Sequence, residues 1–321
     1  MDISGSKILV IGGAGLVGSH LVDQLILEDV EEVIVFDNFV RGTRENLESA
    51  MKSSKTRIIE GDMTNLSELK NALKDIDFVY LLAALWLLQC AENPREGLEV
   101  NVVGTYNALE ACVEAEVQKL IFSSSASVYG DALFTPMTEE HPLNNRTFYG
   151  ATKVAGEQFL RAFNEMYGLD YIALRYMNIY GPRQDYEGAY VSVIMKVLDR
   201  IDAGLSPIIF GDGTQSYDFV YVEDVAKANI CALKSDVTDD VFNIGTGVKT
   251  SINELVHLLL ELTDSSLKPE YRPQDQTFVT DRVGSTEKAE KLLGFRAKVQ
   301  LKEGFEKLIK WRKKQIAKGV N

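Results

Sequence analysis

The sequence predicts an α/β fold, in which a doubly wound parallel sheet is followed by a smaller C-terminal lobe. Strand-like and helix-like segments alternate through the first half, which is the pattern of repeated βα units. The first strand ends in a glycine-rich turn that leads directly into a helix. The chain has 321 residues and is 45% apolar, so it can bury the large core that such a fold needs.

The glycine-rich turn follows an apolar strand expected at 7–11 and precedes an amphipathic helix expected at 19–27. Gly12 permits the turn, Gly15 lets the backbone approach a pyrophosphate, and Gly18 lets the helix lie close to the sheet. The N-terminus of the helix then faces the phosphates of a dinucleotide. The spacing differs by one residue from the usual dinucleotide pattern, and a glycine-rich loop without a ligand is the alternative.

A second strand, expected at 32–36, ends at Asp37, which lies 19 residues beyond Gly18. A carboxylate at this point would bind the adenosine ribose and would repel the 2′-phosphate of NADP. Asp37 therefore favours NAD as the cofactor, although Arg41 and Arg44 stand close enough in the sequence to leave NADP open.

The alternation continues beyond this second strand. We expect strands at 57–60, 77–82 and 119–123, and helices at 66–73 and 94–116. In a parallel sheet the ends of the strands carry the ligands. Two of these ends supply cofactor candidates, namely Asp62 and Met63, and the stretch of Leu82, Ala83 and Ala84. Asn101 is either a further contact or a residue on a helix surface.

Tyr149 and Lys153 are four residues apart, so they share one face of any helix. A tyrosine is a poor base at its ordinary pKa near ~10, and a neighbouring ammonium favours the phenolate. Ser125 follows the strand at 119–123 and can bond the same substrate oxygen. Together these residues predict the removal of a proton from a hydroxyl group. A solvated helix face and a turn-forming serine are the alternatives.

The composition limits the partners. The net charge of −13 and the pI near 4.9 argue against nucleic acid, so an anionic substrate would depend on a few local arginines. Cysteines and histidines are few and scattered, and we expect neither a metal site nor a disulfide framework. No apolar run is long enough for a membrane span, and residues 1–7 lack the apolar core of a signal peptide. We expect a cytoplasmic protein.

A series of motifs extends nearly from end to end. In order they are GGAGLVG at 12–18, DNF at 37–39, GDM at 61–63, LLAA at 81–84, NVVGT at 101–105, SSSASVYG at 123–130, YGATK at 149–153, RYMNIYGPRQ at 175–184, GDGTQSYDFVYVEDVA at 211–226 and YRPQD at 271–275. On these motifs the sequence resembles the extended short-chain dehydrogenase/reductases, and within them the nucleotide-sugar epimerases and dehydratases typified by UDP-galactose 4-epimerase.

The resemblance implies a Rossmann-type fold, NAD as the cofactor and a transient 4-keto sugar. Tyr149 would take the proton of the sugar 4-hydroxyl, Lys153 would hold the nicotinamide ribose and lower the tyrosine pKa, and Ser125 would orient the hydroxyl. The implied cofactor-binding residues are Gly12, Gly15, Leu16, Val17, Gly18, Asp37, Asn38, Asp62, Met63, Leu82, Ala83, Ala84, Asn101, Ser123, Tyr149, Lys153 and Tyr176. The implied substrate-binding residues are Ser125, Ser127, Tyr149, Asn178, Arg183, Tyr217, Arg272 and Asp275, with Asn178 and Arg272 on the diphosphate and Asp275 on the nucleotide ribose.

The chain departs from the family pattern near the substrate. Dehydratases of the family carry Thr-Asp-Glu where this chain has the segment 125–127, Ser-Ala-Ser, so elimination lacks its proton carriers. Tyr217 stands where an arginine usually clamps the diphosphate, and Arg183 and Arg282 are candidates to replace it.

Two further departures concern the sugar pocket. The loop 85–90 is apolar where relatives often carry polar residues, and it forms either core or the lining of an unusual sugar pocket. Val279 occupies a position that limits pocket size in the 4-epimerases, so its small side chain would leave room for an N-acetyl group.

We expect residues 1–181 to form the NAD-binding domain with the catalytic residues, and residues 182–321 to form mainly the nucleotide-sugar-binding lobe, with some chain crossing. In this second half we expect helices at 190–203, 223–234, 252–262, 287–293 and 301–315 and strands at 208–210 and 241–244. By the resemblance, apolar stripes on the helices at 94–116 and 149–167 imply a homodimer through a four-helix bundle, and packing inside one chain is the alternative.

The expected function is 4-epimerisation of UDP-hexoses, either UDP-glucose and UDP-galactose or the N-acetylated pair. Three alternatives remain open: another nucleotide-sugar epimerase that acts on a uronic acid or a non-UDP sugar, a nucleotide-sugar dehydrogenase or reductase, and a non-catalytic NAD-binding sensor.

Overall fold

The centre of the protein is a sheet of seven parallel strands. The computed structural model describes residues 1–184, 192–273 and 281–319. The strands follow the order β11-β6-β5-β4-β1-β2-β3. Their bounds are β1 (Lys7–Ile11), β2 (Glu32–Asp37), β3 (Thr56–Glu60), β4 (Phe78–Leu81), β5 (Lys119–Ser125), β6 (Tyr171–Tyr176) and β11 (Asp240–Ile244). The predicted doubly wound, Rossmann-type sheet is therefore confirmed, and its strand order reverses at β1, where such sheets bind dinucleotides.

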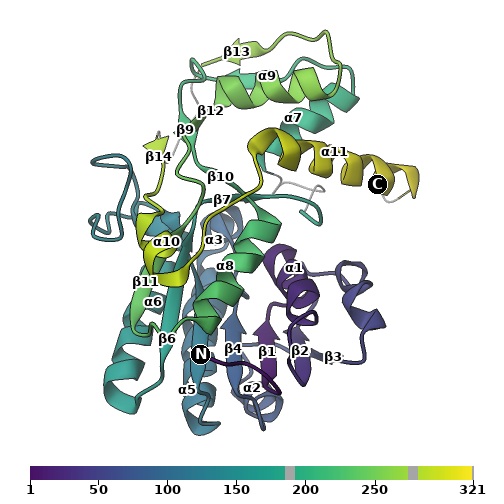
Figure 1. Cartoon of the computed structure of the whole chain (residues 1–321). Coiled ribbons are helices and arrows are strands. Elements are labelled where there is room, and N and C mark those ends of the chain that lie inside the picture. Colours follow the sequence, from purple (N-terminus) through teal and green to yellow (C-terminus); the bar gives the residue numbers. More distant parts are fainter. Residues whose placement is uncertain (185–191, 274–280, 320–321) are drawn as a thin grey trace.

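Helices cover both faces of this sheet (Figure 1). One face carries α1 (Leu16–Leu25), α8 (Val222–Lys234) and α10 (Glu287–Leu293), and the other carries α2 (Leu66–Ala72), α5 (Thr105–Glu114) and α6 (Phe148–Tyr167). Alternate residues of β1 enter the two layers: Ile8 packs with the α1 side and Leu9 with the α5 side. Both faces are thus buried, which explains why the strands are apolar throughout.

A smaller lobe lies above the sheet in Figure 1. Its core is formed by α7 (Val193–Asp202), α9 (Ile252–Leu262) and α11 (Leu301–Ala317). The short strands here are β7 (Asn178–Tyr180), β8 (Ile208–Phe210), β9 (Ser216–Tyr217), β10 (Phe219–Tyr221), β12 (Thr250–Ser251), β13 (Glu270–Arg272) and β14 (Asp281–Arg282). The chain returns to the large sheet through α8, β11 and α10, and the division of domains at residue 181 stays a prediction.

The helix expected at 94–116 is present as one helical run that contains a π-helical segment. It consists of α4 (Pro94–Leu98), a π-helical turn at Glu99–Gly104, and α5, and it follows the short α3 (Leu87–Glu92). Asn101 lies inside the π-helical turn and is only 3% exposed. Its side chain accepts a hydrogen bond from Leu85 N at 2.7 Å and donates one to Leu85 O at 2.8 Å. The wider turn directs this amide inward, so Asn101 is not the helix-surface residue that the sequence left open.

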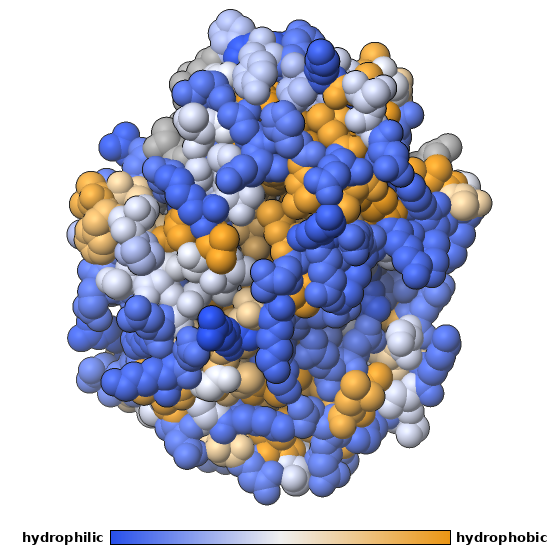
Figure 2. Space-filling model, turned by 45° about the horizontal axis from the view of Figure 1, so that its top comes forward, coloured by the Kyte–Doolittle hydropathy of each residue, from blue (hydrophilic) through white to orange (hydrophobic). Residues whose placement is uncertain are grey.

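The face of the molecule shown in Figure 2 is mostly hydrophilic. On the face shown in Figure 2 the hydrophobic residues gather mainly beneath the smaller lobe, and hydrophilic residues cover most of the rest. Among the described helices, none is long and apolar enough to cross a membrane. Short 3-10 helices occur at Glu45–Leu47, Ala50–Lys52 and Ala126–Val128.

Candidate active site

A cavity of about 1290 Å³ begins at the carboxyl ends of the central strands and continues beneath the smaller lobe. Its wall contains most of the predicted site residues: Gly12, Gly15, Leu16, Val17, Gly18, Asp37, Asn38, Asp62, Met63, Leu82, Ala83, Ala84, Ser125, Ser127, Tyr149, Tyr176, Asn178, Arg183 and Tyr217. Four others, Asn101, Ser123, Lys153 and Arg272, are not part of the wall. Asp275 and Val279 lie outside the described residues.

The glycine turn is shaped to let a dinucleotide approach. Gly12 has a φ of +84°, and a Cβ atom on it would lie 2.6 Å from Ala83 N. A Cβ atom on Gly18 would lie 2.2 Å from Gly12 O, so α1 can pack against the turn only because residue 18 has no side chain. Gly15 caps α1 without any side-chain hydrogen bond, which leaves the first N–H groups of the helix open to an anion. This cradle fits the pyrophosphate of NAD.

Asp37 ends β2 on the wall of the same cavity. The side chain is 8% exposed, and its carboxylate accepts hydrogen bonds from Ala14 N and Phe39 N, each at 2.9 Å. Burial raises the pKa of this carboxyl above its ordinary value, while the two backbone donors act against that rise. The backbone therefore fixes an acceptor beside the glycine turn, where a ribose hydroxyl can donate to it.

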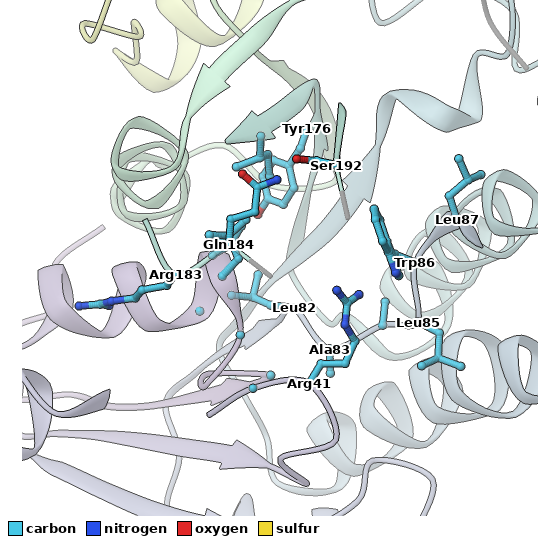
Figure 3. A pocket seen from close by; sticks show the side chains of 18 of the residues that line it. Arg41, Leu82, Ala83, Leu85, Trp86, Leu87, Tyr176, Arg183, Gln184 and Ser192 are labelled. Atoms are coloured by element: carbon cyan, nitrogen blue, oxygen red, sulfur yellow. The ribbon is translucent and has the colours of Figure 1, made fainter. Parts of the chain in front are cut away.

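Arg41 and Arg44, which left NADP possible as the cofactor in the sequence analysis, both contact other residues of the protein. Arg44 donates to Glu60 Oε2 at 2.6 Å and packs over the ring of Phe39. The guanidinium carbon of Arg41 lies 4.9 Å from the centre of the Trp86 ring, and Figure 3 shows the two side chains facing each other at the cavity. These contacts favour an uncharged ribose beside Asp37, as in NAD.

Tyr149 and Lys153 lie one turn apart on α6, which begins with Thr147 as its N-cap. Lys153 Nζ lies 5.7 Å from the centre of the Tyr149 ring and donates to Ser123 O at 2.7 Å. Burial raises the pKa of Tyr149 to about 12, against the opposing effects of a hydrogen bond with Ser125 and of the charge on Arg282. Burial also lowers the pKa of Lys153 to about 8. The structure thus brings Tyr149, Ser125 and Lys153 together, as the sequence predicts.

Two of the predicted cofactor contacts lie behind the cavity wall. Asn101 donates to Thr152 Oγ1 at 3.2 Å, and Ser123 accepts the hydrogen bond from Lys153 through its carbonyl oxygen. In this structure both residues fix the position of α6 and its neighbours. Their proposed contact with the cofactor stays a prediction.

The apolar loop at 85–90 divides between core and wall. Cys90 is fully buried, whereas Leu85, Trp86 and Leu87 line the cavity, Leu85 with only 7% exposure. The sequence left core and pocket as alternatives, and the structure assigns residues to both. Nothing in the sequence distinguishes them, because the orientation of this loop depends on tertiary contacts such as the hydrogen bonds between Asn101 and Leu85.

The predicted diphosphate contacts are separated in space. Asn178 lies on the cavity wall, and its Nδ2 has no hydrogen-bond partner within the described residues. Arg272 is exposed on β13 and pairs with Glu270 at 2.8 Å. Arg183 also reaches the wall, but its guanidinium is paired with Asp23 on α1 at 2.5 Å, and Figure 3 shows it directed along that helix. Within the described residues, Asn178 Nδ2 and the buried Nη1 of Arg183 have no hydrogen-bond partner, but only Arg183 also has a carboxylate partner.

The sequence also left some wall residues without a role. Met177, Ile179 and Phe219 line the cavity from the smaller lobe, as does Trp311 from the distant α11. Apolar residues in short strands and amphipathic helices give no signal that separates a cavity wall from a core, because both patterns follow from burial.

A glycine cradle for a dinucleotide, next to a Tyr-Lys-Ser group at the cavity, defines an NAD-dependent enzyme of the short-chain dehydrogenase/reductase class. Comparison with known proteins gives the family. The sequence model of the NAD-dependent epimerase/dehydratase family matches residues 8–245, and the chain belongs to this family. The predictions of the family and of NAD as its cofactor are confirmed.

Individual relatives cover the whole fold. The UDP-glucose 4-epimerase of Mycolicibacterium smegmatis is 34% identical over 308 residues, which are 95% of this chain and 98% of the relative. The UDP-N-acetylglucosamine 4-epimerase of Methanobrevibacter ruminantium, solved with UDP-N-acetylmuramic acid, has a TM-score of 0.92 at 34% identity and covers 97% of this chain and 99% of its own. The UDP-glucose 4-epimerase of Thermotoga maritima, solved with UDP-glucose, has a TM-score of 0.90 at 35% identity with the same coverage.

Proposed function

We propose that the protein is a UDP-hexose 4-epimerase that interconverts UDP-glucose and UDP-galactose or the N-acetylated pair. One observation carries the proposal: Tyr149, hydrogen-bonded to Ser125, faces the cavity next to a segment 125–127 that has no carboxyl group. A base without a neighbouring acid supports removal and return of one proton, and it does not support loss of water. The names of the relatives in Mycolicibacterium, Thermotoga and Methanobrevibacter support the UDP-sugar class and both hexose types.

The residues of the chain perform the proton transfer. Ser125 orients the 4-hydroxyl of the sugar, Tyr149 takes its proton, and the ammonium of Lys153 stabilises the phenolate. NAD, when bound, accepts a hydride from the substrate and later returns it. Tyr149 returns the proton after the 4-keto sugar has turned over in the cavity, which inverts the centre. The glycine cradle at Gly12 and Gly18 and the carboxylate of Asp37 would hold NAD through the cycle.

An NMR assay with the purified protein tests this function. The protein is incubated with UDP-, CDP-, GDP- and dTDP-sugars without added cofactor, and inversion at C4 is followed. We expect inversion of a UDP-hexose, and none with Tyr149→Phe. Conversion that requires added NAD and yields stoichiometric NADH would show a dehydrogenase instead. Binding of NAD without any turnover would show the sensor.

We also propose a homodimer in the cytoplasm. Tyr106 on α5 is 46% exposed, and Met166 and Tyr167 on α6 are 68% and 56% exposed, which leaves apolar surface on both helices. Such a surface suits a four-helix bundle between two copies. Light scattering should give the mass of a dimer for the native protein and of a monomer for Tyr106→Glu. The cysteines Cys90, Cys112 and Cys231 are free thiols, which agrees with a reducing compartment.

A further inference from the structure

Arg282 is a half-buried cation on the cavity wall, and it lies beside Tyr217. The two residues are direct partners in the parallel pairing of β14 with β9. Parallel strands in register direct paired side chains to the same face of the sheet, and both residues line the cavity. The guanidinium on one strand can therefore reach the space in front of the phenol on the other.

Among the described residues, the charge of Arg282 has an electrostatic neighbour in Asp131 but no direct ion pair. Within the same residues its Nε is shielded from water without a hydrogen-bond partner. Burial lowers the pKa of this arginine below its ordinary value, with Tyr217, Asp131 and Tyr149 as its electrostatic neighbours. A buried guanidinium without a counter-ion is costly, and the cost falls when a ligand supplies negative charge.

Three other arginines that lie near the site or were candidates for the diphosphate have carboxylate partners. Arg175 is paired with Glu157, Arg183 with Asp23, and Arg272 with Glu270. Of the two candidates that the sequence gave for the missing clamp, Arg183 has a carboxylate partner and Arg282 does not. The Nδ2 of Asn178, on the same wall, also has no protein partner. Arg282 and Asn178 therefore form a pair of open donors.

We propose that Arg282 binds the diphosphate of the nucleotide-sugar substrate from the strand beside Tyr217. This inference rests on the proposed function. A nucleotide sugar whose reacting hydroxyl meets Tyr149 has its diphosphate between that hydroxyl and its base. Arg282 is placed for this segment, because its charge acts on Tyr149 at one end of the cavity and its strand neighbour Tyr217 belongs to the smaller lobe. The forked donors of an arginine match phosphate oxygens.

Calorimetric titration of the NAD-loaded protein tests the assignment. The probes are UDP, UMP, UDP-glucose and UDP-glucuronate. Arg282→Met should lower the affinity for UDP and UDP-glucose by about 10- to 100-fold, as expected for a lost charge-assisted contact. The affinity for UMP should fall less. The matched control is Arg296→Met, which removes an exposed arginine paired with Glu290, and it should bind all four probes as the native protein does.

Moving the charge across the strand pair gives a sharper test. Adding Tyr217→Arg to Arg282→Met should restore UDP affinity to within about threefold, because paired residues of neighbouring strands lie about 5 Å apart. Arg282→Lys keeps the charge without the fork and should lose part of the affinity. If Arg282→Met does not fold, the Arg282→Lys variant tests the assignment instead. UDP affinity unchanged in Arg282→Lys would then overturn it.

Two other results would also overturn it. UDP affinity within twofold of native in a folded Arg282→Met variant would exclude a diphosphate contact. A loss confined to UDP-glucuronate would assign Arg282 to a carboxylate on the sugar instead. Failure of the proposed function looks different, because the native protein would then fail to invert C4 of a UDP-hexose, whatever residue stands at position 282.

Discussion

Lys153 Nζ lies 5.7 Å from the centre of the Tyr149 ring and is held there by the carbonyl oxygen of Ser123. Burial raises the pKa of Tyr149 to about 12 and lowers that of Lys153 to about 8. Burial therefore lets the ammonium lose its proton more readily than the phenol. In the proposed reactive form, a phenolate beside an ammonium, the first proton leaves the tyrosine instead.

Turnover should rise with pH through about 8, because the reactive form exists only after one proton has left the pair. In Lys153→Met the phenol must ionise without a neighbouring cation. The rise of turnover with pH should therefore occur at higher pH, and turnover at pH 7 should fall by about 10²-fold or more. Rates measured from pH 6 to 10 check this. Lys119→Met is the control: burial lowers the pKa of Lys119 to about 8 as well, but this lysine contacts Ala232 and Ser235 away from the cavity. If turnover of Lys153→Met rose over the same pH range as that of the native protein, the role of Lys153 beside Tyr149 would be contradicted.

Local patterns in the sequence predict the sheet and most of the cavity wall. The alternation of strands and helices, the glycine turn and the Tyr149–Lys153 spacing each depend on residues close together in the chain. Pairing between distant short strands has no such signal. β9 and β14 have two residues each, and nothing in either segment predicts that Tyr217 and Arg282 are partners.

Burial is the second property that the sequence does not give. Asn101 has the same polar side chain whether it faces water or the interior, and only the π-helical turn directs it to Leu85. Arg183 and Arg272 are equally plausible phosphate ligands by residue type. Their carboxylate partners are Asp23, which is distant in sequence, and Glu270, which is near, and only the structure shows that both pairs form.

Asp37→Ser should change the choice of cofactor. Loss of the carboxylate removes an acceptor for the ribose, so the affinity for NAD should fall by about 10-fold or more. It also removes the repulsion of a 2′-phosphate, so the affinity for NADP should rise. Both affinities can be measured by titration after the bound nucleotide is removed. Asp77→Ser serves as the control, since this carboxylate accepts hydrogen bonds from Lys7 N and Gln118 Nε2 and is not part of the cavity wall. NADP binding as weak in Asp37→Ser as in the native protein would refute this role of Asp37.

Gly18→Ala should lower the stability of the fold, whereas Gly15→Ala should lower only the affinity for NAD. A Cβ atom on Gly18 would lie 2.2 Å from Gly12 O and 2.7 Å from Gly13 Cα, so α1 must shift and stability should fall by ~1–3 kcal/mol. A Cβ atom on Gly15 meets nothing closer than 3.5 Å, so this variant should fold normally. It should nevertheless lose NAD, because the methyl group stands where the pyrophosphate approaches. Urea unfolding without nucleotide, followed by NAD titration, separates the two effects, and equal stability of both variants would be inconsistent with the geometry.

The ion pair of Arg175 with Glu157 joins β6 to α6, the helix that carries the proposed catalytic residues Tyr149 and Lys153. Arg175 Nη2 lies 2.7 Å from Glu157 Oε2, and Ser124 Oγ donates to Glu157 Oε1 at 2.5 Å. Both charged side chains are almost fully buried, at 5% and 4% exposure. Arg175→Met leaves the carboxylate buried without its cation, and stability in urea at pH 7 should fall by ~3–5 kcal/mol.

The cost should come from the uncompensated charge rather than from lost packing. Arg175→Met combined with Glu157→Leu removes both charges and should recover most of the loss, because apolar pairs of similar volume replace buried ion pairs at little cost. Ser124→Ala, which removes only a hydrogen bond to the same carboxylate, should cost about 1–3 kcal/mol. If the double variant proved as unstable as Arg175→Met alone, the shape of the arginine, and not its charge, would be what β6 and α6 require.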